Sequence, residues 1–258
     1  MTLIYAVVLG IVQGLTEFLP VSSSGHLVLL NRLFGPQENF LLFSVLLHLA
    51  TLLAVLIVFH KDVKQMILHP FCPMAKKIYV SFVPTALIVL LFKNSFEMAF
   101  EGKMVSVCFL ITALILLVCD FFAKERKKPY QLDGQISYKN AFVIGICQGF
   151  AAMPGISRSG STICAGLLLG ENREEVAKFS FLMSIPVIVC SVAYEIIFSG
   201  GLSAFSGASI FPVLCGFLCA FLVGILAVKF MLKVVKRARY FWFSIYLVIL
   251  GILSIIYL

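Results

Sequence analysis

Two short polar segments interrupt long apolar stretches of this chain, and they hold the residue types that could do chemistry. The first reads LPVSSSGH over 19–26, and the second reads MPGISRSGS over 153–161. Gln13 and Glu17 precede the first segment four residues apart, so they share one face of a helix. The candidate site residues are Gln13, Glu17, Ser22, Ser23, Ser24 and His26 from the first half of the chain, and Ser157, Arg158, Ser159 and Thr162 from the second.

The serine runs and the arginine predict a site for a phosphate-like anion. Each run precedes an apolar stretch expected to be a helix, so its serines can cap that helix, and the free N–H groups of the first turn face the polar segment. The planar guanidinium of Arg158 can hold a phosphate through two parallel hydrogen bonds. We assign anion binding to the residues around these helix starts: Gln13, Ser22, Ser24, Ser157, Ser159 and Thr162. For the serines, capping alone is the structural alternative.

Glu17 lies well inside an apolar stretch, where an ionisable residue is costly and points to function. Its carboxylate would repel a bound phosphate unless a cation lay between them. A Mg²⁺ or Ca²⁺ ion held by Glu17 and by phosphate oxygens meets that need. Two structural alternatives remain: Glu17 extends its carboxylate to the membrane surface, or Arg158 is simply its counter-ion.

Ser23 and His26 are the candidates for nucleophile and proton transfer. His26 follows Ser22 by four residues and Ser23 by three, so imidazole and hydroxyl can meet if the helix has begun by then. A histidine could activate a serine nucleophile or protonate a leaving group. His48, in the next apolar run, is assigned either to support behind the site or to packing.

The elements that must position these residues are membrane helices. Hydrophobic residues make up 61% of the 258 residues, charged residues 12%, and mean hydropathy is +1.07. Such a chain cannot cover a water-facing surface with polar side chains, and no short alternating segments typical of a β-barrel occur. The net charge of +8 comes from basic residues scattered between apolar runs, so no nucleic-acid partner is expected. The sequence predicts an all-α polytopic membrane protein with the lipid bilayer as its solvent.

The apolar runs predict six transmembrane helices and two re-entrant helix hairpins. The expected spans are 41–59, 77–92, 104–121, 176–197, 208–230 and 240–257. The hairpins, at about 3–33 and 140–170, have the polar segments at their broken centres. Basic residues gather in 60–76, 122–139 and 229–239, and the positive-inside rule places these loops in the cytoplasm and both termini outside.

The two polar segments belong to an internal repeat. GIVQGLTEFLPVSSSG at 10–25 aligns with GICQGFAAMPGISRSG at 145–160, at a constant offset of 135 residues. Each repeat holds a hairpin and three spans, and because three is odd the second repeat enters the membrane inverted. The expected units are repeat 1 at 1–121, a cytoplasmic basic loop at 122–139 and repeat 2 at 140–258. The two hairpin tips are then expected to meet near the middle of the membrane.

The polar segments resemble the signature segments of the undecaprenyl-diphosphate phosphatases of the bacitracin-resistance family. The residues concerned are QGLTEFLPVSSSGHL at 13–27 and PGISRSGST at 154–162, with HLATLLAV at 48–55 similar to a further part of the pattern. The resemblance covers essentially the whole chain in length, segment order and repeat. It implies a bacterial plasma (inner) membrane enzyme that hydrolyses undecaprenyl diphosphate to undecaprenyl phosphate and inorganic phosphate. Such an enzyme recycles the lipid carrier of cell-wall synthesis and confers bacitracin resistance, since bacitracin competes for the substrate.

The resemblance also implies roles for individual residues. Glu17 and Gln13 fall on the family's acidic motif, and Arg158 falls on its diphosphate-binding arginine. Ser23 and His26 fall on the proposed nucleophile and acid/base. Many members have Glu where Gln13 stands, and because Gln13 cannot act as a base, Glu17 is expected to carry more of the function.

The expected active site opens to the outer, periplasmic side of the membrane, and a homodimer is compatible with the sequence. The alternative function is an inverted-repeat transporter or flippase for an anionic or phosphorylated lipid, because inverted repeats often serve alternating access.

Overall fold

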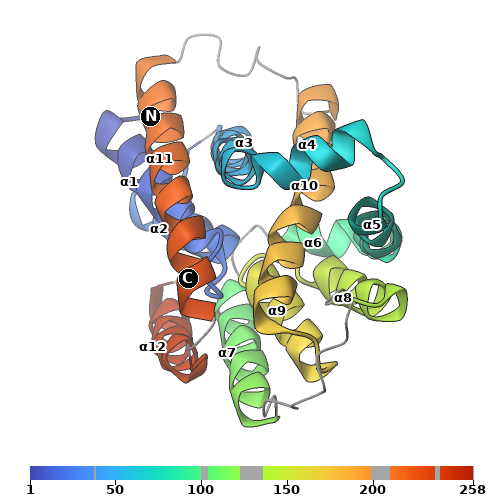
Figure 1. Cartoon of the computed structure of the whole chain (residues 1–258). Helices are drawn as coiled ribbons and strands as arrows, with labels where there is room; N and C mark the ends of the chain where they lie inside the picture. The colour runs from blue at the N-terminus through green and yellow to red at the C-terminus, as the bar shows by residue number, and fades with distance from the viewer. Residues whose placement is uncertain (38, 100–103, 123–135, 199–209, 236–238, 258) are drawn as a thin grey trace.

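Every regular element in the described part of the chain is an α-helix (Figure 1). The computed structural model describes residues 1–37, 39–99, 104–122, 136–198, 210–235 and 239–257. The helices are α1 (Leu3–Thr16), α2 (Ser23–Leu33), α3 (Phe40–Val58), α4 (His60–Leu68), α5 (Pro73–Leu91), α6 (Lys93–Ala99), α7 (Val105–Phe122), α8 (Tyr138–Phe150), α9 (Arg158–Leu168), α10 (Arg173–Phe198), α11 (Ile210–Val235) and α12 (Phe241–Tyr257). The prediction of an all-α protein is confirmed for these residues.

Five helices are long and apolar enough to cross a membrane, namely α3, α5, α7, α10 and α11. They correspond to five of the six predicted spans. The sixth predicted span is α12, which is apolar and has 17 residues. This set of helices makes the chain a multi-pass membrane protein.

Helix extends into three segments that were expected to be loops. The segment 60–76 contains α4, the segment 93–103 contains α6, and α11 continues through Val235 into the predicted basic loop 229–239. Lys, Gln, Met and Glu in these segments are good helix formers, so their polarity does not end a helix. α5 likewise begins earlier than predicted, because Pro73 is suited to the first turn of a helix. Most of the second predicted basic loop, 122–139, lies outside the described residues, because these exclude 123–135.

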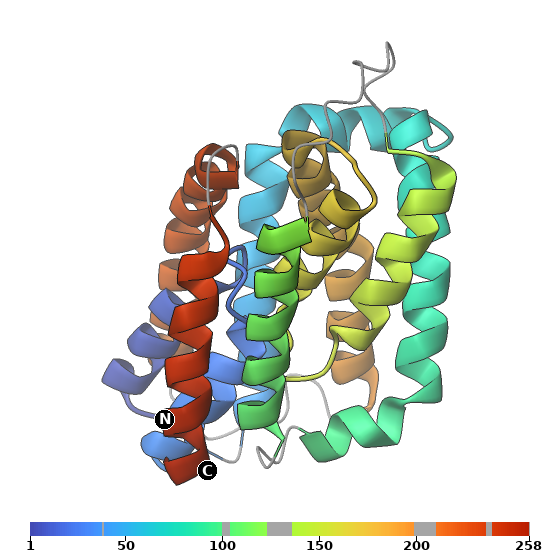
Figure 2. The ribbon, with the colours of Figure 1, turned by 90° about the horizontal axis from the view of Figure 1, so that it is seen from below.

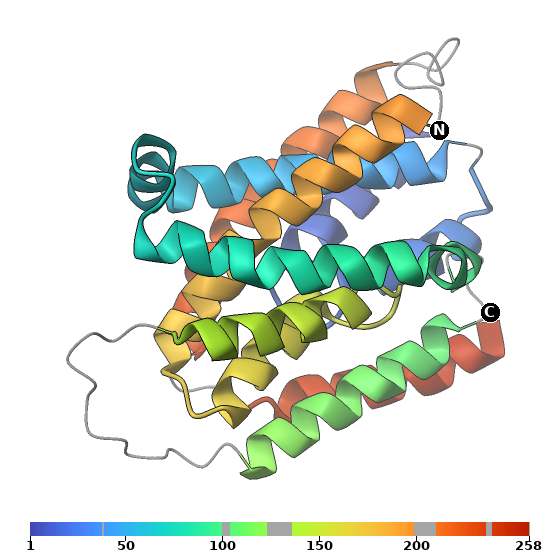
Figure 3. The ribbon, with the colours of Figure 1, turned by 90° about the vertical axis from the view of Figure 1, so that its right-hand side faces the viewer.

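The two helix hairpins enter the helical bundle from opposite ends. Figures 2 and 3 show α4 lying across one end of the bundle and α6 across the other, with both chain termini at the α6 end. α1 begins at the end that carries the termini, whereas α8 begins at the end that carries α4 (Figure 3). Two apolar hairpins that enter from opposite ends can place their tips together inside the bundle.

Helix packing in the first half of the chain has a counterpart in the second half. α1 packs against α11 and α8 against α5, while α3 packs against α11 and α10 against α5. Within each half the hairpin helices contact each other, α1 with α2 and α8 with α9. Two further pairs, α3 with α10 and α7 with α12, join the halves. These particular pairs match when α1, α2, α3, α5 and α7 are set against α8, α9, α10, α11 and α12.

Glycines bring the first helix of each hairpin into backbone contact with a long span. A Cβ atom at Gly10 would collide with the carbonyl oxygen of Gly216 in α11, and one at Gly145 would collide with that of Ser81 in α5. Gly10 and Gly145 are equivalent in the repeat. Small residues of this kind allow close helix packing where lipid offers no hydrophobic driving force. The hairpins are thereby anchored to the spans that surround them.

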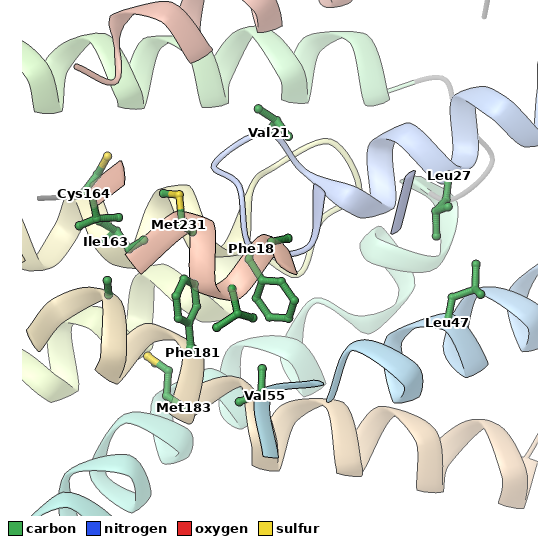
Figure 4. Packing of buried hydrophobic residues seen from close by; sticks show 14 of the residues in the cluster. Phe18, Val21, Leu27, Leu47, Val55, Ile163, Cys164, Phe181, Met183 and Met231 are labelled. Carbon is green, nitrogen blue, oxygen red and sulfur yellow. The ribbon is translucent and has the colours of Figure 1, made fainter. Parts of the chain in front are cut away.

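The buried core surrounds the tip of the first hairpin. Phe18, which follows Glu17, packs edge-on against Phe181 of α10 with ring centroids 5.5 Å apart (Figure 4). Val21 and Val55 are also buried in this cluster. Tight packing on both sides of Glu17 holds its backbone in place, so the direction of its carboxylate is set by the fold.

Candidate active site

The first hairpin turns between Glu17 and Ser22. α1 ends at Thr16 with Glu17 as its C-cap, and α2 begins at Ser23 with Ser22 as its N-cap. The Ser22 hydroxyl accepts a hydrogen bond from the Gly25 N–H at 3.4 Å. Ser22 has a φ of 65°, in a region that non-glycine residues rarely adopt. Such a conformation persists only where the surroundings impose it, and it makes the tip sharp.

The second hairpin has the same construction. Ser157 is the N-cap of α9, and its hydroxyl accepts a hydrogen bond from the Gly160 N–H at 3.0 Å. Thr112 of α7 holds this tip, because its hydroxyl donates to the Gly155 carbonyl at 3.0 Å and accepts from the Ser157 N–H at 3.1 Å. Arg158, the first residue of α9, therefore starts from a fixed backbone.

The two tips meet through Glu17 and Arg158. Arg158 Nη2 forms a hydrogen-bonded ion pair with Glu17 Oε1. A second contact joins the tips, from the Ser159 hydroxyl to the Leu19 carbonyl at 2.9 Å. The Glu17 side chain is only 2% exposed and that of Arg158 is 19% exposed. A carboxylate so deeply buried is tolerated only with a partner charge and further hydrogen bonds.

The other oxygen of Glu17 accepts hydrogen bonds from its own hairpin. The Ser23 hydroxyl donates to Oε2 at 2.6 Å, and Gln13 Nε2 donates to the same atom at 2.8 Å. His48 Nε2 of α3 lies 3.5 Å from Oε2. Gln13 Nε2 also reaches the Thr51 hydroxyl at 3.4 Å. The predicted shared face of Gln13 and Glu17 is confirmed, and Glu17 is the centre of a polar cluster enclosed by apolar helices.

His26 does not belong to this cluster. Its Nδ1 lies 2.7 Å from the Ser22 carbonyl oxygen and its Nε2 lies 2.6 Å from the Tyr246 hydroxyl of α12. The expected contact between His26 and a serine hydroxyl is therefore not formed. The helix has begun as expected, but the i, i+4 relationship brings the imidazole to the Ser22 backbone, while the Ser23 side chain turns to Glu17.

The predicted hydroxyl and arginine side chains at the two helix starts divide into a buried group and a partly buried group. Ser22, Ser157, Ser159 and Thr162 are buried and already engaged: the first two are caps, Ser159 bonds Leu19, and Thr162 bonds the Ser180 hydroxyl of α10 at 2.6 Å. Ser23, Ser24 and Arg158 are only partly buried. These three lie at the starts of α2 and α9, where free N–H groups and the helix dipoles favour an anion.

Three residues of the site have a position that the sequence did not predict, or for which it allowed two interpretations. His48 was undecided between support and packing, and its position beside Glu17 assigns it to support. Thr51, one turn further along α3, joins the site through Gln13, and its spacing from His48 is the one signal of this in the sequence. Tyr246 lies 220 residues from His26, and nothing in the sequence relates the two.

A divalent cation is compatible with part of this cluster. Among the described residues, no group of three or more His, Cys, Asp or Glu side chains could hold a metal ion. Gln13 Oε1, however, is buried without a hydrogen-bond partner among those residues, on the same amide whose Nε2 donates to the Glu17 carboxylate. Amide and carboxylate oxygens are the ligands that Mg²⁺ and Ca²⁺ prefer. Two protein oxygens leave several positions for phosphate oxygens and water.

Fold and site together define a class: a multi-pass helical membrane protein in which a carboxylate at one helix end meets a serine and an arginine at the starts of two other helices inside the bundle. The chain belongs to the bacitracin resistance protein BacA family, whose sequence model matches residues 6–253. It is 44% identical over 249 residues to an undecaprenyl-diphosphatase of Carboxydothermus hydrogenoformans, covering 96% of this chain and 94% of the relative.

Two further relatives bear the same name. The undecaprenyl-diphosphatase of Christiangramia forsetii is 44% identical over 266 residues, covering 98% of this chain and 97% of the relative. That of Campylobacter fetus is 38% identical over 264 residues, covering 100% of both. The resemblance inferred from the two polar segments is thus confirmed over the full chain.

Proposed function

We propose that this protein hydrolyses undecaprenyl diphosphate to undecaprenyl phosphate and inorganic phosphate in the bacterial plasma membrane. In this role it recycles the lipid carrier for cell-wall synthesis and confers resistance to bacitracin, which competes for the same diphosphate. The observation that carries the proposal is the ion pair between Glu17, at the end of α1, and Arg158, at the start of α9, beside the Ser23 hydroxyl. The names of the relatives support this substrate.

Substrate binding is assigned mainly to the second hairpin. In the absence of substrate the Arg158 guanidinium is occupied by Glu17. A diphosphate would compete for that guanidinium, offering two oxygens to its fork. The N–H groups at the starts of α2 and α9, with Ser24 beside them, favour the same anion. The other predicted binding residues act indirectly, because their hydrogen bonds fix the shape of the two tips. They are Gln13, Ser22, Ser157, Ser159 and Thr162.

The chemical step is assigned to the first hairpin. An oxygen nucleophile, either Ser23 Oγ or a water molecule in its place, attacks the terminal phosphorus, and the bond from that phosphorus to the bridging oxygen breaks, which releases undecaprenyl phosphate. Attack by water gives inorganic phosphate directly, whereas attack by Ser23 gives a phosphoserine that a water molecule then hydrolyses to inorganic phosphate and the free hydroxyl. Ser23 already donates its proton toward Glu17 Oε2 at 2.6 Å, so Glu17 is placed to accept it. Arg158 stabilises the charge that spreads over the phosphoryl oxygens.

His26 is the other group of this hairpin with the capacity to transfer a proton. Its protonation state depends on the two contacts that its ring nitrogens make.

The Glu17 carboxylate and Gln13 Oε1 would hold the divalent cation, Mg²⁺ or Ca²⁺. The ion would neutralise negative charge on the phosphate oxygens. The unpartnered amide oxygen of Gln13 supports this assignment.

The membrane arrangement that we propose has six spans, two re-entrant hairpins and an inverted repeat of residues 1–121 and 140–258. The opposite entry of α1 and α8 and the matched helix pairings support it. With the basic segment 60–76 in the cytoplasm, α6 and both termini lie outside, and the site opens to the periplasmic side.

Release of inorganic phosphate by the purified protein in detergent is the test of this function. Detergent micelles have no two sides, so a transporter or flippase without hydrolytic activity would release nothing, whereas a phosphatase would turn over. The names of the relatives do not favour the transporter. Undecaprenyl diphosphate is the substrate, and the matched control is the Glu17→Gln protein prepared in parallel. Equal phosphate release by both proteins, or none by either, would contradict the proposal.

A further inference from the structure

The contact between His26 and Tyr246 joins the first hairpin to the last helix of the chain. Tyr246 lies on α12, and its hydroxyl is 2.6 Å from His26 Nε2. The His26 residue is 7% exposed, whereas Tyr246 is 44% exposed on the outer face of α12. The Tyr246 hydroxyl forms a hydrogen bond with a buried imidazole, so this side chain has a polar contact in addition to its packing.

The other contact of His26 determines which ring nitrogen carries the proton. A backbone carbonyl can only accept a hydrogen bond, so Nδ1, at 2.7 Å from the Ser22 carbonyl, must be the N–H donor. In the neutral imidazole, Nε2 is then an acceptor, and the Tyr246 O–H donates to it. The two contacts select one tautomer, with the basic nitrogen directed at Tyr246.

The orientation of the His26 ring is fixed by two aromatic neighbours. The Tyr246 ring lies nearly parallel to the imidazole, with an interplanar angle of 8° and centroids 5.7 Å apart. The Phe109 ring of α7 meets it edge-on with centroids 5.4 Å apart. These neighbours hold the imidazole plane, and a half-turn of the ring would put carbon atoms in the places of Nδ1 and Nε2 and lose both hydrogen bonds.

We propose that Tyr246 is a positioning residue for His26: its O–H donates to Nε2 and holds the imidazole oriented in its neutral, Nδ1-protonated form. When Nε2 takes up the proton released by the attacking oxygen during phosphate hydrolysis, the phenol O–H turns away and the Tyr246 oxygen accepts from Nε2–H. This inference rests on the proposed function for its consequence in turnover. The hydrogen bond itself can be tested without any activity. The Tyr246 hydroxyl acts only through the imidazole and needs no contact with the substrate.

Kinetics of three variants test the role in turnover. Tyr246→Phe keeps the stacked ring and removes only the hydroxyl, so kcat should fall about tenfold while KM changes by less than about twofold. Tyr246→Leu also removes the ring and should lose more. In a His26→Ala background, Tyr246→Phe should cause no further loss, because its effect passes through His26. Tyr79→Phe, at an exposed tyrosine of α5, is the matched control and should leave kcat unchanged.

Nitrogen-15 NMR of histidine-labelled protein tests the hydrogen bond directly. The chain has only four histidines, and the His26→Ala protein identifies the signals of His26. The wild type should show Nδ1 protonated and Nε2 as a hydrogen-bonded acceptor, and Tyr246→Phe should shift the Nε2 resonance.

Three outcomes would overturn the inference: full kcat in Tyr246→Phe, an equal loss from that substitution in the His26→Ala background, or an unchanged Nε2 signal. If the wild type released no phosphate, the proposed function would fail, while the NMR result would still decide whether Tyr246 sets the tautomer.

Discussion

Glu17 and Arg158 form a buried ion pair although 141 residues separate them in the chain. Each comes from the tip of a different hairpin, at the start or end of a helix. Under the proposed function, we expect an anionic substrate to compete with Glu17 for the Arg158 guanidinium and to free one carboxylate oxygen, which would couple substrate binding to activation of the carboxylate.

Glu17→Gln should abolish phosphate release at every Mg²⁺ concentration. The amide can neither accept the Ser23 proton nor hold a cation as a carboxylate does, and it leaves Arg158 without its charged partner. Phosphate release by purified protein measures the loss, and a monodisperse elution profile shows that the variant is folded. Glu174→Gln, at an exposed residue of α10, is the control. Near-normal turnover of Glu17→Gln would remove Glu17 from the chemistry.

Arg158→Lys should weaken substrate binding and also slow turnover. Lysine keeps the charge but loses the fork that binds two oxygens, and charge on the phosphoryl oxygens must still be stabilised in the transition state. We expect KM to rise about tenfold and kcat to fall about tenfold or more. Arg32→Lys, at the end of α2, is the control. An unchanged KM with a reduced kcat would show that Arg158 does not hold the substrate.

Ser23→Ala and His26→Ala should lower kcat about 10²-fold or more with KM largely retained, as expected for groups that act in the chemical step. Ser191→Ala, at an exposed serine of α10, should have no effect. If Ser23→Ala keeps substantial activity while His26→Ala does not, water is the nucleophile in place of Ser23. Full activity in both variants would place the chemistry outside the first hairpin.

Gln13→Glu should be tolerated and should make activity more dependent on the divalent cation. Gln13 Nε2 now donates to Glu17 Oε2 at 2.8 Å, so the substitution places two carboxylates in contact. Only a cation or a proton between them relieves that repulsion. Titration of activity with Mg²⁺ after chelation should show a lower half-saturating concentration than in the wild type. Loss of activity at all Mg²⁺ concentrations would argue against a cation held at this position.

The ends of α5 should be accessible from opposite sides of the membrane. In a protein whose eight native cysteines are replaced, we expect Asn94→Cys to react with a membrane-impermeant maleimide added to intact cells and Lys64→Cys to remain unlabelled. Both positions are on exposed faces of short helices, Asn94 on α6 and Lys64 on α4. Disrupted cells, in which both cysteines should react, provide the control. Labelling of Lys64→Cys alone in intact cells would invert the proposed orientation.

Much of this molecule follows from the sequence because the signals are local or periodic. Apolar run length predicted the membrane helices, and the 135-residue offset aligned the two polar segments that now lie between α1 and α2 and between α8 and α9. The spacing of Gln13 and Glu17 predicted their shared face, since helical geometry alone brings residues i and i+4 together. The same local reasoning failed where polar segments continue as helix, in α4 and α6, because polarity does not prevent helix formation.

The tertiary structure decided which of these groups touch. From the spacing alone, Ser23 was expected to meet His26, whereas in the structure the turn at Ser22 directs its hydroxyl to the Glu17 carboxylate. His26 instead meets Tyr246, a residue that no local pattern connects to it. Contacts between distant helices depend on how their surfaces pack and on which rotamers the packing permits. Periodicity along one helix carries no information about those choices, so they appear only when the helices are assembled.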